Sequence, residues 1–416
     1  MNQWTSNNSL RLLENGEEFF PAVLAAIDNA KEEVFIETFI WSEDTTGRKV
    51  RDALVAARQR GVQVGILVDD YGTPGLSKDF LRPMENAGIA VRSFDPQPSI
   101  LNIRTNMLCR MHRKIAVVDS AVGFVGGINI CDTHLRSYGS DSKQDYAVQV
   151  SGPAVPRLRE FCRSAHLQDE PRTRANWRYW LRRIPKEITE PGNDAQVLLV
   201  QRDNREHPTD IETLYRLAIR NCTRSMIIAN AYFFPGYRFI RQLCRAARGG
   251  AEIIVVVQGK PDRPMTVAAS SVVYDDLLAA GVRIFEYTER PLHAKVAVMD
   301  DNWATVGSSN LDPVSLGLNL EANLFIFDQA FSAALRANLT RLIETHCTEL
   351  IASDRPKPGP VKRLLTTVAY HLTRHMWSWG RSAGIRKQRI EPIADGPVNG
   401  LDTEHMQPNT DGNNQR

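Results

Sequence analysis

The sequence predicts an α/β fold of two homologous halves with mixed sheets, joined around one active site at their pseudo-two-fold interface. Helical patterns alternate with short apolar strands along most of the chain, which is typical of sheets that are covered by helices. The same order of elements occurs twice, and both times it ends in the same short polar motif. With 416 residues, the chain is long enough for two such units and their cores.

The apolar residues of the first unit alternate between helical spacing and short continuous runs. Such runs are rich in β-branched and aromatic residues, as expected of buried strands. The sequence predicts, in order, a helix around 20–27, a strand at 34–40, a helix at 48–60, a strand at 62–68, a helix ending at 88 and a further strand.

The second unit repeats this order. Ala-Gly precedes the last strand in both units, at 87–88 and at 280–281. Because Gly commonly ends a helix, this repeated dipeptide marks equivalent helix ends. The predicted elements are a helix at 211–220, a strand at 226–232, a helix at 237–248, a strand at 253–257, a helix ending at 281 and a strand at 282–285.

These patterns and changes of composition divide the chain into five parts. Nine Lys or Arg and no acidic residue occur between Arg355 and Arg389, interspersed with Trp and Leu, and the residues beyond are polar and predicted to be disordered. The parts are an N-terminal extension (1–9), a first half (10–170), a basic aromatic linker (171–193), a second half (194–354) and a basic amphipathic C-terminal tail (355–416).

Composition sets limits on where the protein acts. The N-terminus lacks the apolar core of a signal peptide, and no run of about 18 uncharged apolar residues occurs, so no transmembrane helix is expected. Cationic residues mixed with Trp, in the linker and in the tail, are typical of helices that lie at a membrane surface. We therefore expect peripheral association with an anionic membrane.

The six cysteines have no paired spacing and are interpreted as reduced thiols.

The motif that ends each unit carries the residues for chemistry. Its first copy has His112, Lys114 and Asp119, then a Gly-Gly pair at 126–127 and Asn129. On a strand, residues two apart share a face, so the His and the Lys are expected to project together. A polar set repeated at identical spacing is more typical of one two-fold active site than of core packing. The second copy consists of His293, Lys295, Asp300, Gly307, Ser308 and Asn310.

Two imidazoles in one site can support displacement at phosphorus. One attacks the phosphorus and forms a covalent intermediate, while the other, protonated, donates to the departing oxygen. Ammonium and amide groups then suit the charged phosphoryl oxygens. Because the lysines supply positive charge, and no carboxylates are spaced for Mg²⁺ or Ca²⁺, we expect neither a metal nor a cofactor.

The duplicated His-x-Lys-x4-Asp pattern resembles the phospholipase D superfamily, and the resemblance extends to about residue 330. Further segments resemble bacterial cardiolipin synthases, most of all the short B-type enzymes, which lack N-terminal membrane spans. Val314 departs from many of them, which carry Arg after Leu-Asp-Pro. The segments are Glu37–Trp41, Asp70–Gly72, Met111–Lys114, Gly307–Pro313 and Leu318–Asn323.

The resemblance implies a role for each motif residue. It makes His112 the nucleophile and His293 the general acid and later base, although the near-symmetric halves leave this order open. Asp145 and Glu321 lie where the superfamily has carboxylates that orient the histidines. Asp119 and Asp300 belong to the catalytic motif but are interpreted as mainly structural. The phosphate-binding residues would be Lys114, Lys295, Asn129 and Asn310.

The activity implied by the resemblance is phosphatidyl transfer. The donor would be phosphatidylglycerol and the acceptor a second phospholipid alcohol, with release of glycerol, at the cytoplasmic side of the cell membrane. No nucleic acid partner is expected. One alternative is hydrolysis of a phospholipid or nucleic acid by a phosphodiesterase, because the same chemistry serves nucleases. Another is a non-catalytic lipid-binding scaffold, which the two intact motifs disfavour. The sequence leaves the donor, the acceptor and the oligomeric state open.

Other polar and apolar residues have plainer interpretations. Residues 99–111 could form an apolar lip where acyl chains enter, and Asp69 and Asp70 could cap a turn. The remaining histidines considered lack a partner pattern and are interpreted as surface groups: residues 134, 166, 207, 371, 375 and 405.

Overall fold

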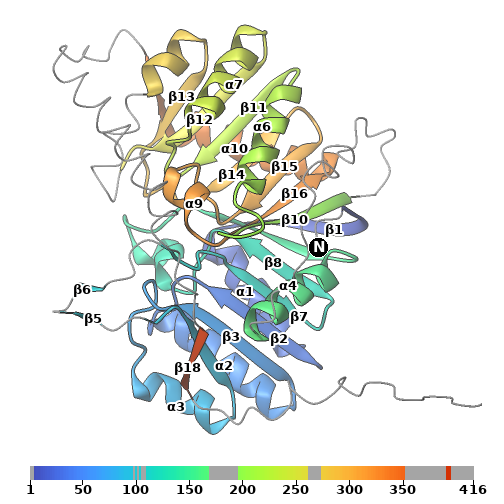
Figure 1. Cartoon of the computed structure of the whole chain (residues 1–416), viewed down its shortest axis with the longest axis vertical. Helices are drawn as coiled ribbons and strands as arrows, with labels where there is room; N and C mark the ends of the chain where they lie inside the picture. Colours follow the sequence, from blue (N-terminus) through green and yellow to red (C-terminus); the bar gives the residue numbers. More distant parts are fainter. Residues whose placement is uncertain are drawn as a thin grey trace, which may run out of the picture.

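The computed structural model describes residues 4–96, 99–100, 103–104, 109–167, 195–260, 273–351 and 390–394 (Figure 1). The linker 171–193 and most of the tail lie outside these ranges, as does most of the apolar segment before the first motif. The membrane-docking predictions for these segments are therefore untested. Within the described part of the chain, no helix has the length and apolar character needed to cross a membrane.

The first half is built from alternating strands and helices, as the apolar pattern predicts. β1 begins at Thr5, so residues 5–9 belong to the sheet, and the predicted extension 1–9 is wrong in that part. The elements are β1 Thr5–Glu14, α1 Asn15–Asp28, β2 Glu33–Thr38, α2 Thr45–Gln59, β3 Gln63–Asp69, α3 Lys78–Asn86, β4 Ala90–Phe94, β5 Ser99–Ile100, β6 Ile103–Arg104, β7 Ile115–Val118, β8 Val122–Gly126, the 3-10 turns η1 Asp132–His134 and η2 Arg136–Tyr138, β9 Tyr146–Ser151 and α4 Val155–Leu167.

The second half repeats this order. One strand from the tail, β18, follows it and pairs antiparallel with β4 at the edge of the first half, so the predicted disorder from residue 391 is wrong for 391–394. The elements are β10 Ala195–Arg202, α6 Asp210–Asn221, β11 Ser225–Asn230, α7 Tyr237–Arg248, β12 Glu252–Gln258, β13 Arg283–Tyr287, β14 Lys295–Met299, β15 Trp303–Gly307, α9 Pro313–Gly317, β16 Glu321–Phe327, α10 Gln329–His346, β17 Cys347–Glu349 and β18 Ile390–Ala394.

The two halves share one continuous sheet of 16 strands in the order β17-β13-β12-β11-β14-β15-β16-β10-β1-β9-β8-β7-β2-β3-β4-β18. If each strand is matched with its copy in the other half, the order is the same outward from the β10–β1 pair in both directions as far as β13 and β4. The two edge strands are not copies, because β17 follows α10 and β18 comes from the tail. Each half contains three parallel strands (β2, β3 and β4; β11, β12 and β13) among antiparallel ones. The predicted mixed α/β halves are confirmed, with a pseudo-two-fold relation between them.

Helices cover both faces of this sheet (Figure 1). On one face, each half has its own apolar core, formed by α1, α2 and α3 in the first half and by α6 and α7 in the second. On the other face, α4 and α10 pack on a single core that runs across both halves. Since burial of apolar surface contributes about 25 cal/mol per Å², this shared core holds the halves in a fixed relation. Their relation, in turn, positions the two motifs.

Candidate active site

Each histidine motif is tied to a strand of the opposite half. The His112 amide donates to the Leu320 carbonyl (2.8 Å), and the His293 amide donates to the Gln144 carbonyl (2.8 Å). Isolated parallel bridges join the flanking residues, Met111 with Leu320 and Gln144 with Leu292. The residues that follow these acceptors in the chain, Glu321 and Asp145, are the two predicted orienting carboxylates. The pairing across the interface therefore brings each imidazole to a carboxylate of the other half.

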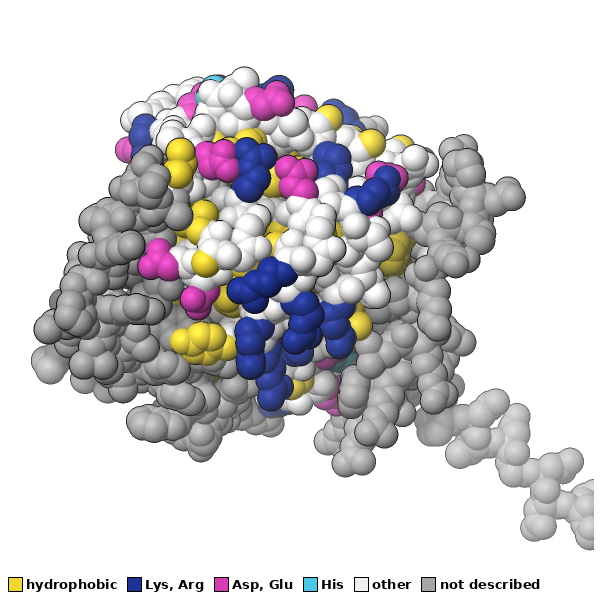
Figure 2. All heavy atoms as spheres, turned by 90° about the horizontal axis from the view of Figure 1, so that it is seen from above, with side chains coloured by type: hydrophobic (Ala, Val, Ile, Leu, Met, Phe, Trp, Pro, Cys, Tyr) yellow, Lys and Arg dark blue, Asp and Glu magenta, His cyan; other side chains and the backbone are white. Residues whose placement is uncertain are grey.

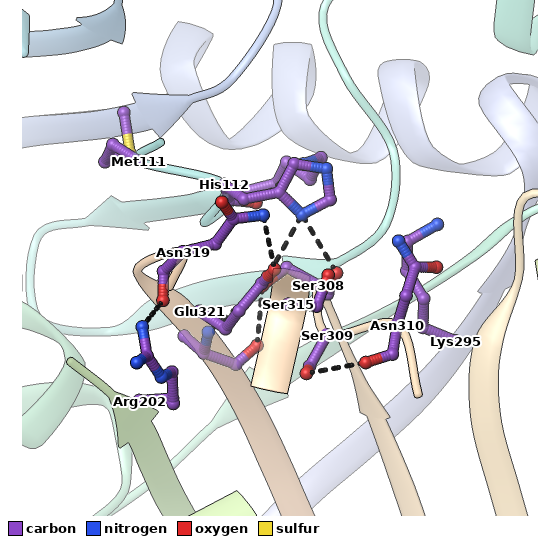
Figure 3. A network of polar contacts seen from close by, with 12 residues as sticks. Met111, His112, Arg202, Lys295, Ser308, Ser309, Asn310, Ser315, Asn319 and Glu321 are labelled. Carbon is purple, nitrogen blue, oxygen red and sulfur yellow. Dashed lines mark hydrogen bonds and ion pairs between the residues drawn. The ribbon is translucent and has the colours of Figure 1, made fainter. Parts of the chain in front are cut away.

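The two groups that contact Nδ1 of the His112 ring are both hydrogen-bond acceptors. Nδ1 lies 3.0 Å from Glu321 Oε2 and 3.1 Å from the Ser308 carbonyl oxygen (Figure 3). The Ser308 hydroxyl donates to the same carboxylate oxygen at 2.5 Å. Because both neighbours of Nδ1 are acceptors, that nitrogen carries the proton. The other ring nitrogen, Nε2, is left with its lone pair, as a nucleophile requires.

The His293 ring has a matching partner in Asp145. Nδ1 of His293 lies 2.5 Å from Asp145 Oδ2, and Asp145 Oδ1 accepts the backbone N–H of Tyr146 at 2.8 Å. Both carboxylates are fully buried. Burial raises the pKa of Asp145 to about 6. Burial also acts to raise the pKa of Glu321, but His112 and Lys114 outweigh it, and the pKa of Glu321 is lowered. The two carboxylates are thus not electrostatically equivalent.

The residue that contacts the carboxylate differs between the two motifs. Gly127 lies against the shorter Asp145, and Ser308 lies against the longer Glu321. A Cβ on Gly127 would overlap the Asp145 carboxylate. Ser308 occupies the corresponding position in the second half, and its hydroxyl binds Glu321. Gly127 therefore makes room for the carboxylate that contacts His293.

The lysines and asparagines of the motif lie buried at the same place. Lys114 Nζ donates to the His112 carbonyl (2.6 Å), and Lys295 Nζ donates to that of His293. Burial lowers the pKa of Lys114 to about 7 and of Lys295 to about 8. Asn129 Oδ1 accepts the Ile40 N–H, while its Nδ2 has no hydrogen-bond partner among the described residues. Ammonium groups and a buried amide donor without a partner are groups that bind phosphoryl oxygens.

Both imidazoles are neutral in the unliganded site. Burial lowers the pKa of His112 to about 4 and that of His293 well below its usual value, and Lys295 adds to the effect on His293. A phosphodiester bound beside both rings would add a negative charge there, and an adjacent opposite charge favours the protonated form of an imidazole.

The structure does not bring Asp119 and Asp300 to the imidazoles. They lie at the far ends of β7 and β14, both with positive φ (51° and 47°). Asp119 accepts the backbone N–H groups of residues 31–33, and Asp300 accepts those of residues 223–225. These contacts fix the start of β2 and of β11. They support the structural interpretation and give the pair no place in the chemistry.

The sequence interpretation was wrong for three histidines. His134, His166 and His207 are buried, not surface groups. His134 is fully enclosed beside Asp145, and its spacing from Asn129 gave no signal because Ser315 occupies the corresponding position of the second motif. Asp69, expected to cap a turn, does accept the Gly72 N–H, but it is buried and also accepts the Met111 N–H at 2.7 Å. It therefore holds the segment that leads into the first motif.

His134, Asp145 and His293 have ligand atoms within 4.8 Å of one another, a spacing that a metal ion could use. However, His134 Nε2 accepts the backbone N–H of Asn129, so its proton lies on Nδ1, on the side of Asp145. A metal there would have to displace that proton and the His293–Asp145 hydrogen bond. A protonated Nδ1 facing Asp145 and an intact His293–Asp145 hydrogen bond do not fit a metal centre. The absence of a metal stays a prediction.

Comparison with known proteins agrees with this geometry. A family model described as "Cardiolipin synthase, PLD-like domain" matches residues 23–156 and again 215–343. The chain belongs to this family. Cardiolipin synthase B of Escherichia coli K12 is 46% identical over 394 residues, 94% of each chain, and that of Shigella flexneri is equally similar. Cardiolipin synthase A of Pseudomonas putida F1 is 31% identical over 88% of this chain and 74% of its own length. The predicted resemblance to B-type enzymes is confirmed.

Solved structures share the fold at low identity. Phosphatidylserine synthase of Haemophilus influenzae superposes with a TM-score of 0.65 at 15% identity, over 88% of this chain and 94% of that one. Polyphosphate kinase of Porphyromonas gingivalis gives 0.52 at 15% identity, over 90% of this chain and 54% of that one. These likenesses support the two-half architecture alone.

Proposed function

We propose that the protein makes cardiolipin by transferring a phosphatidyl group from phosphatidylglycerol to the hydroxyl of a second phospholipid, with release of glycerol. The observation that carries this proposal is the pair of crossed imidazole–carboxylate contacts, His112 with Glu321 and His293 with Asp145. They supply one nucleophile and one acid–base group in the same site. The similarity to cardiolipin synthases B over 94% of the chain supports the choice of lipid substrates.

In the first step, Nε2 of His112 attacks the phosphorus of phosphatidylglycerol. The P–O bond to glycerol breaks, and protonated His293 gives its Nε2 proton to the departing oxygen. Positive charge develops on the His112 ring as the P–N bond forms, and the ionised Glu321 stabilises it through Nδ1–H. The ammonium groups of Lys114 and Lys295 bind the phosphoryl oxygens, whose negative charge also restores the ammonium form that burial disfavours.

In the second step, the acceptor alcohol replaces glycerol. His293, now neutral, takes the hydroxyl proton while the alcohol oxygen attacks phosphorus, and the P–N bond to His112 breaks. Both imidazoles return to their starting protonation states. Splitting one displacement into two lets each step use the same charged groups. Water in place of the acceptor would give hydrolysis, so the outcome depends on which hydroxyl reaches the phosphatidyl-enzyme.

The products distinguish the alternatives. Wild-type protein supplied with vesicles of labelled phosphatidylglycerol is expected to release glycerol and form labelled cardiolipin, as measured by mass spectrometry of the lipids. His112→Ala is expected to form none while still binding the vesicles. Phosphatidic acid as the main product would show a hydrolase. Metal-independent cleavage of single-stranded DNA that requires His112, with no lipid product, would show a nuclease.

We further propose peripheral association with anionic membranes, and α7 offers a surface for it. Arg238, Arg241, Arg245 and Arg248 are exposed, while the other side of the helix is buried in the core. The helix has no acidic residue, and these arginines form no ion pair with any described carboxylate. Figure 2, viewed from the end of the molecule where α7 lies, shows Lys and Arg side chains gathered on this face.

Charge reversal tests this surface. Arg241→Glu with Arg245→Glu is expected to weaken binding to phosphatidylglycerol-containing vesicles by at least about tenfold in a sedimentation assay, because each cation near such a surface contributes about 1 kcal/mol. Lys49→Glu with Arg82→Glu, exposed on α2 and α3, is the matched control. Equal losses in both double variants would mean that net charge, not α7, determines binding. The cytoplasmic side and the lack of a nucleic acid partner stay predictions.

A further inference from the structure

A third imidazole lies behind the His293–Asp145 pair. His134 is fully buried, and its Nδ1 lies 3.9 Å from Asp145 Oδ2, the oxygen that binds His293. The rings of His134 and His293 meet edge to face, with centroids 5.6 Å apart and planes at 72°. The Asp145 carboxylate oxygen therefore faces two imidazoles, and of these His293 lies at hydrogen-bonding distance.

The protonation state of His134 follows from its contacts. Its Nε2 lies 3.2 Å from the backbone nitrogen of Asn129, and a backbone N–H can only donate, so Nε2 accepts. Burial lowers the pKa of His134 well below its usual value, so the ring is neutral. The single proton therefore lies on Nδ1, the nitrogen nearest Asp145. Nδ1 has no hydrogen-bond partner in the described part of the chain, which leaves this N–H to act on the carboxylate.

Neighbouring contacts fix the position of His134. It ends the turn η1, whose first residue, Asp132, accepts the backbone N–H groups of Thr45 and Thr46 at the start of α2. The carbonyl of Thr133 accepts the N–H of Lys143 at 2.7 Å. The first two residues of the turn are thus bonded to other segments, so the ring is placed by more than apolar packing.

The second motif has no such imidazole. Ser315 follows Asn310 by five residues, as His134 follows Asn129, but its side chain bonds to Asp312. Glu321 is supported instead by the Ser308 hydroxyl. The third imidazole is therefore specific to the half-site that contains His293.

We propose that His134 is a positioning residue for His293: its Nδ1–H faces Asp145 and weakens the hold of that carboxylate on the His293 proton, so that His293 can release it, and its Nε2 anchors the backbone of Asn129. This inference rests on the proposed transfer reaction and deepens it. The site is otherwise strongly cationic. The charged groups facing His134 and His293 are Asp145, Lys114 before β7, Lys143 before β9, and Arg290 and Lys295 before and at the start of β14.

The direction of the effect follows. Asp145 is ionised above about pH 6 whether or not His293 carries a proton. The positive end of the His134 dipole, which faces this pair, therefore disfavours the positively charged form of His293 and lowers the pKa of that ring. The first step requires neutral His112 and protonated His293, so the alkaline limb of the kcat/KM profile reports loss of the His293 proton. Removing the Nδ1–H is therefore expected to raise the pKa of His293 and move the alkaline limb to higher pH, by on the order of one pH unit. The acidic limb, set at His112, stays in place.

Two variants separate the two ring nitrogens. In His134→Asn the amide N–H can take the place of Nδ1–H, whereas in His134→Gln the amide oxygen can take the place of Nε2 as acceptor. His134→Asn is expected to keep the alkaline limb, and His134→Gln to shift it and to lower kcat about tenfold. His166→Asn, another buried histidine that bonds to the Cys162 carbonyl away from the site, is the control and is expected to shift neither limb.

The pH profile of kcat/KM can be measured on whichever product forms, cardiolipin or phosphatidic acid. Failure of the proposed transferase function can therefore be distinguished from failure of the proposal about His134. A second readout needs no turnover: histidine-selective ¹⁵N NMR is expected to show His134 protonated at Nδ1 and not at Nε2 from pH 6 to 9. An alkaline limb unmoved in His134→Gln, or equal shifts in the Asn and Gln variants, would overturn the proposal. So would an Nε2-protonated His134 in the wild-type spectrum.

Discussion

The two half-sites have the same motif but different surroundings. His112 faces a glutamate that a serine hydroxyl supports and whose pKa is lowered. His293 faces an aspartate whose pKa burial raises to about 6, with a second imidazole behind it. A permanent anion suits a nucleophile that becomes positively charged, and a carboxylate that shares protons suits an acid–base group. Two copies of one motif can therefore take different roles in a reaction because the residues around them differ.

Loss of either catalytic imidazole tests this division most severely. His112→Ala is expected to abolish turnover, because no covalent intermediate can form. His293→Ala is expected to slow glycerol release about 10²- to 10⁴-fold, the usual contribution of an acid. With phosphatidyl-p-nitrophenol, whose leaving group needs no proton, His293→Ala should keep a burst of nitrophenol and His112→Ala should have none. Stopped-flow absorbance measures the burst, and its loss in both variants would contradict the division.

Neutralising the two carboxylates should affect opposite limbs of the pH profile. Glu321→Gln removes the anion beside His112, which lowers the pKa of that ring and moves the acidic limb to lower pH. Asp145→Asn does the same to His293 and moves the alkaline limb to lower pH. Each variant is expected to lose about 10²-fold or more in kcat/KM. If Glu321→Gln moved the alkaline limb instead, the roles of the two imidazoles would have to be exchanged.

Substitution of Ser308 or Gly127 tests how each of the two carboxylates is held. Ser308→Ala removes one hydrogen bond to a buried carboxylate, so about a 10- to 100-fold loss of kcat is expected, with a normal fold. Gly127→Ser places a side chain where the Asp145 carboxylate lies, so a larger loss and a lower thermal midpoint are expected. Calorimetry and lipid assays measure both. Full activity in Gly127→Ser would show that Asp145 is not held where the structure places it.

The smallest expected effect concerns stability. Burial raises the pKa of Asp69 to about 7, and the aligned strand of the second half ends in Gln258. Between about pH 4 and 7, folded Asp69 holds a proton that the unfolded chain has lost, so its contribution to stability falls as pH rises. The thermal midpoint of wild type should therefore lose more between pH 5 and 7.5 than that of Asp69→Asn. Parallel midpoints in the two proteins would rule out this titration.

The repeated order of helices and strands could be predicted from the sequence because apolar spacing and the Ala-Gly helix ends are local signals. The motif residues and the two carboxylates could be named because they recur at fixed spacing or match a family pattern. The edge strand β18 could not be predicted, since its partner β4 lies about 300 residues away in the chain. His134 was missed for a related reason: its counterpart, Ser315, is a different residue, so the repeat conceals it.

The division of roles between the two half-sites depends on which imidazole carries the phosphatidyl group. Wild-type protein is to be mixed with phosphatidylglycerol in a single turnover, denatured rapidly at neutral pH, digested and analysed by mass spectrometry. A phosphatidyl adduct is expected on the peptide that contains His112. A larger amount of it is expected with phosphatidyl-p-nitrophenol as the donor, because that lipid has no free hydroxyl to act as acceptor. An adduct on His293, or none at any time during turnover, would contradict this division of roles.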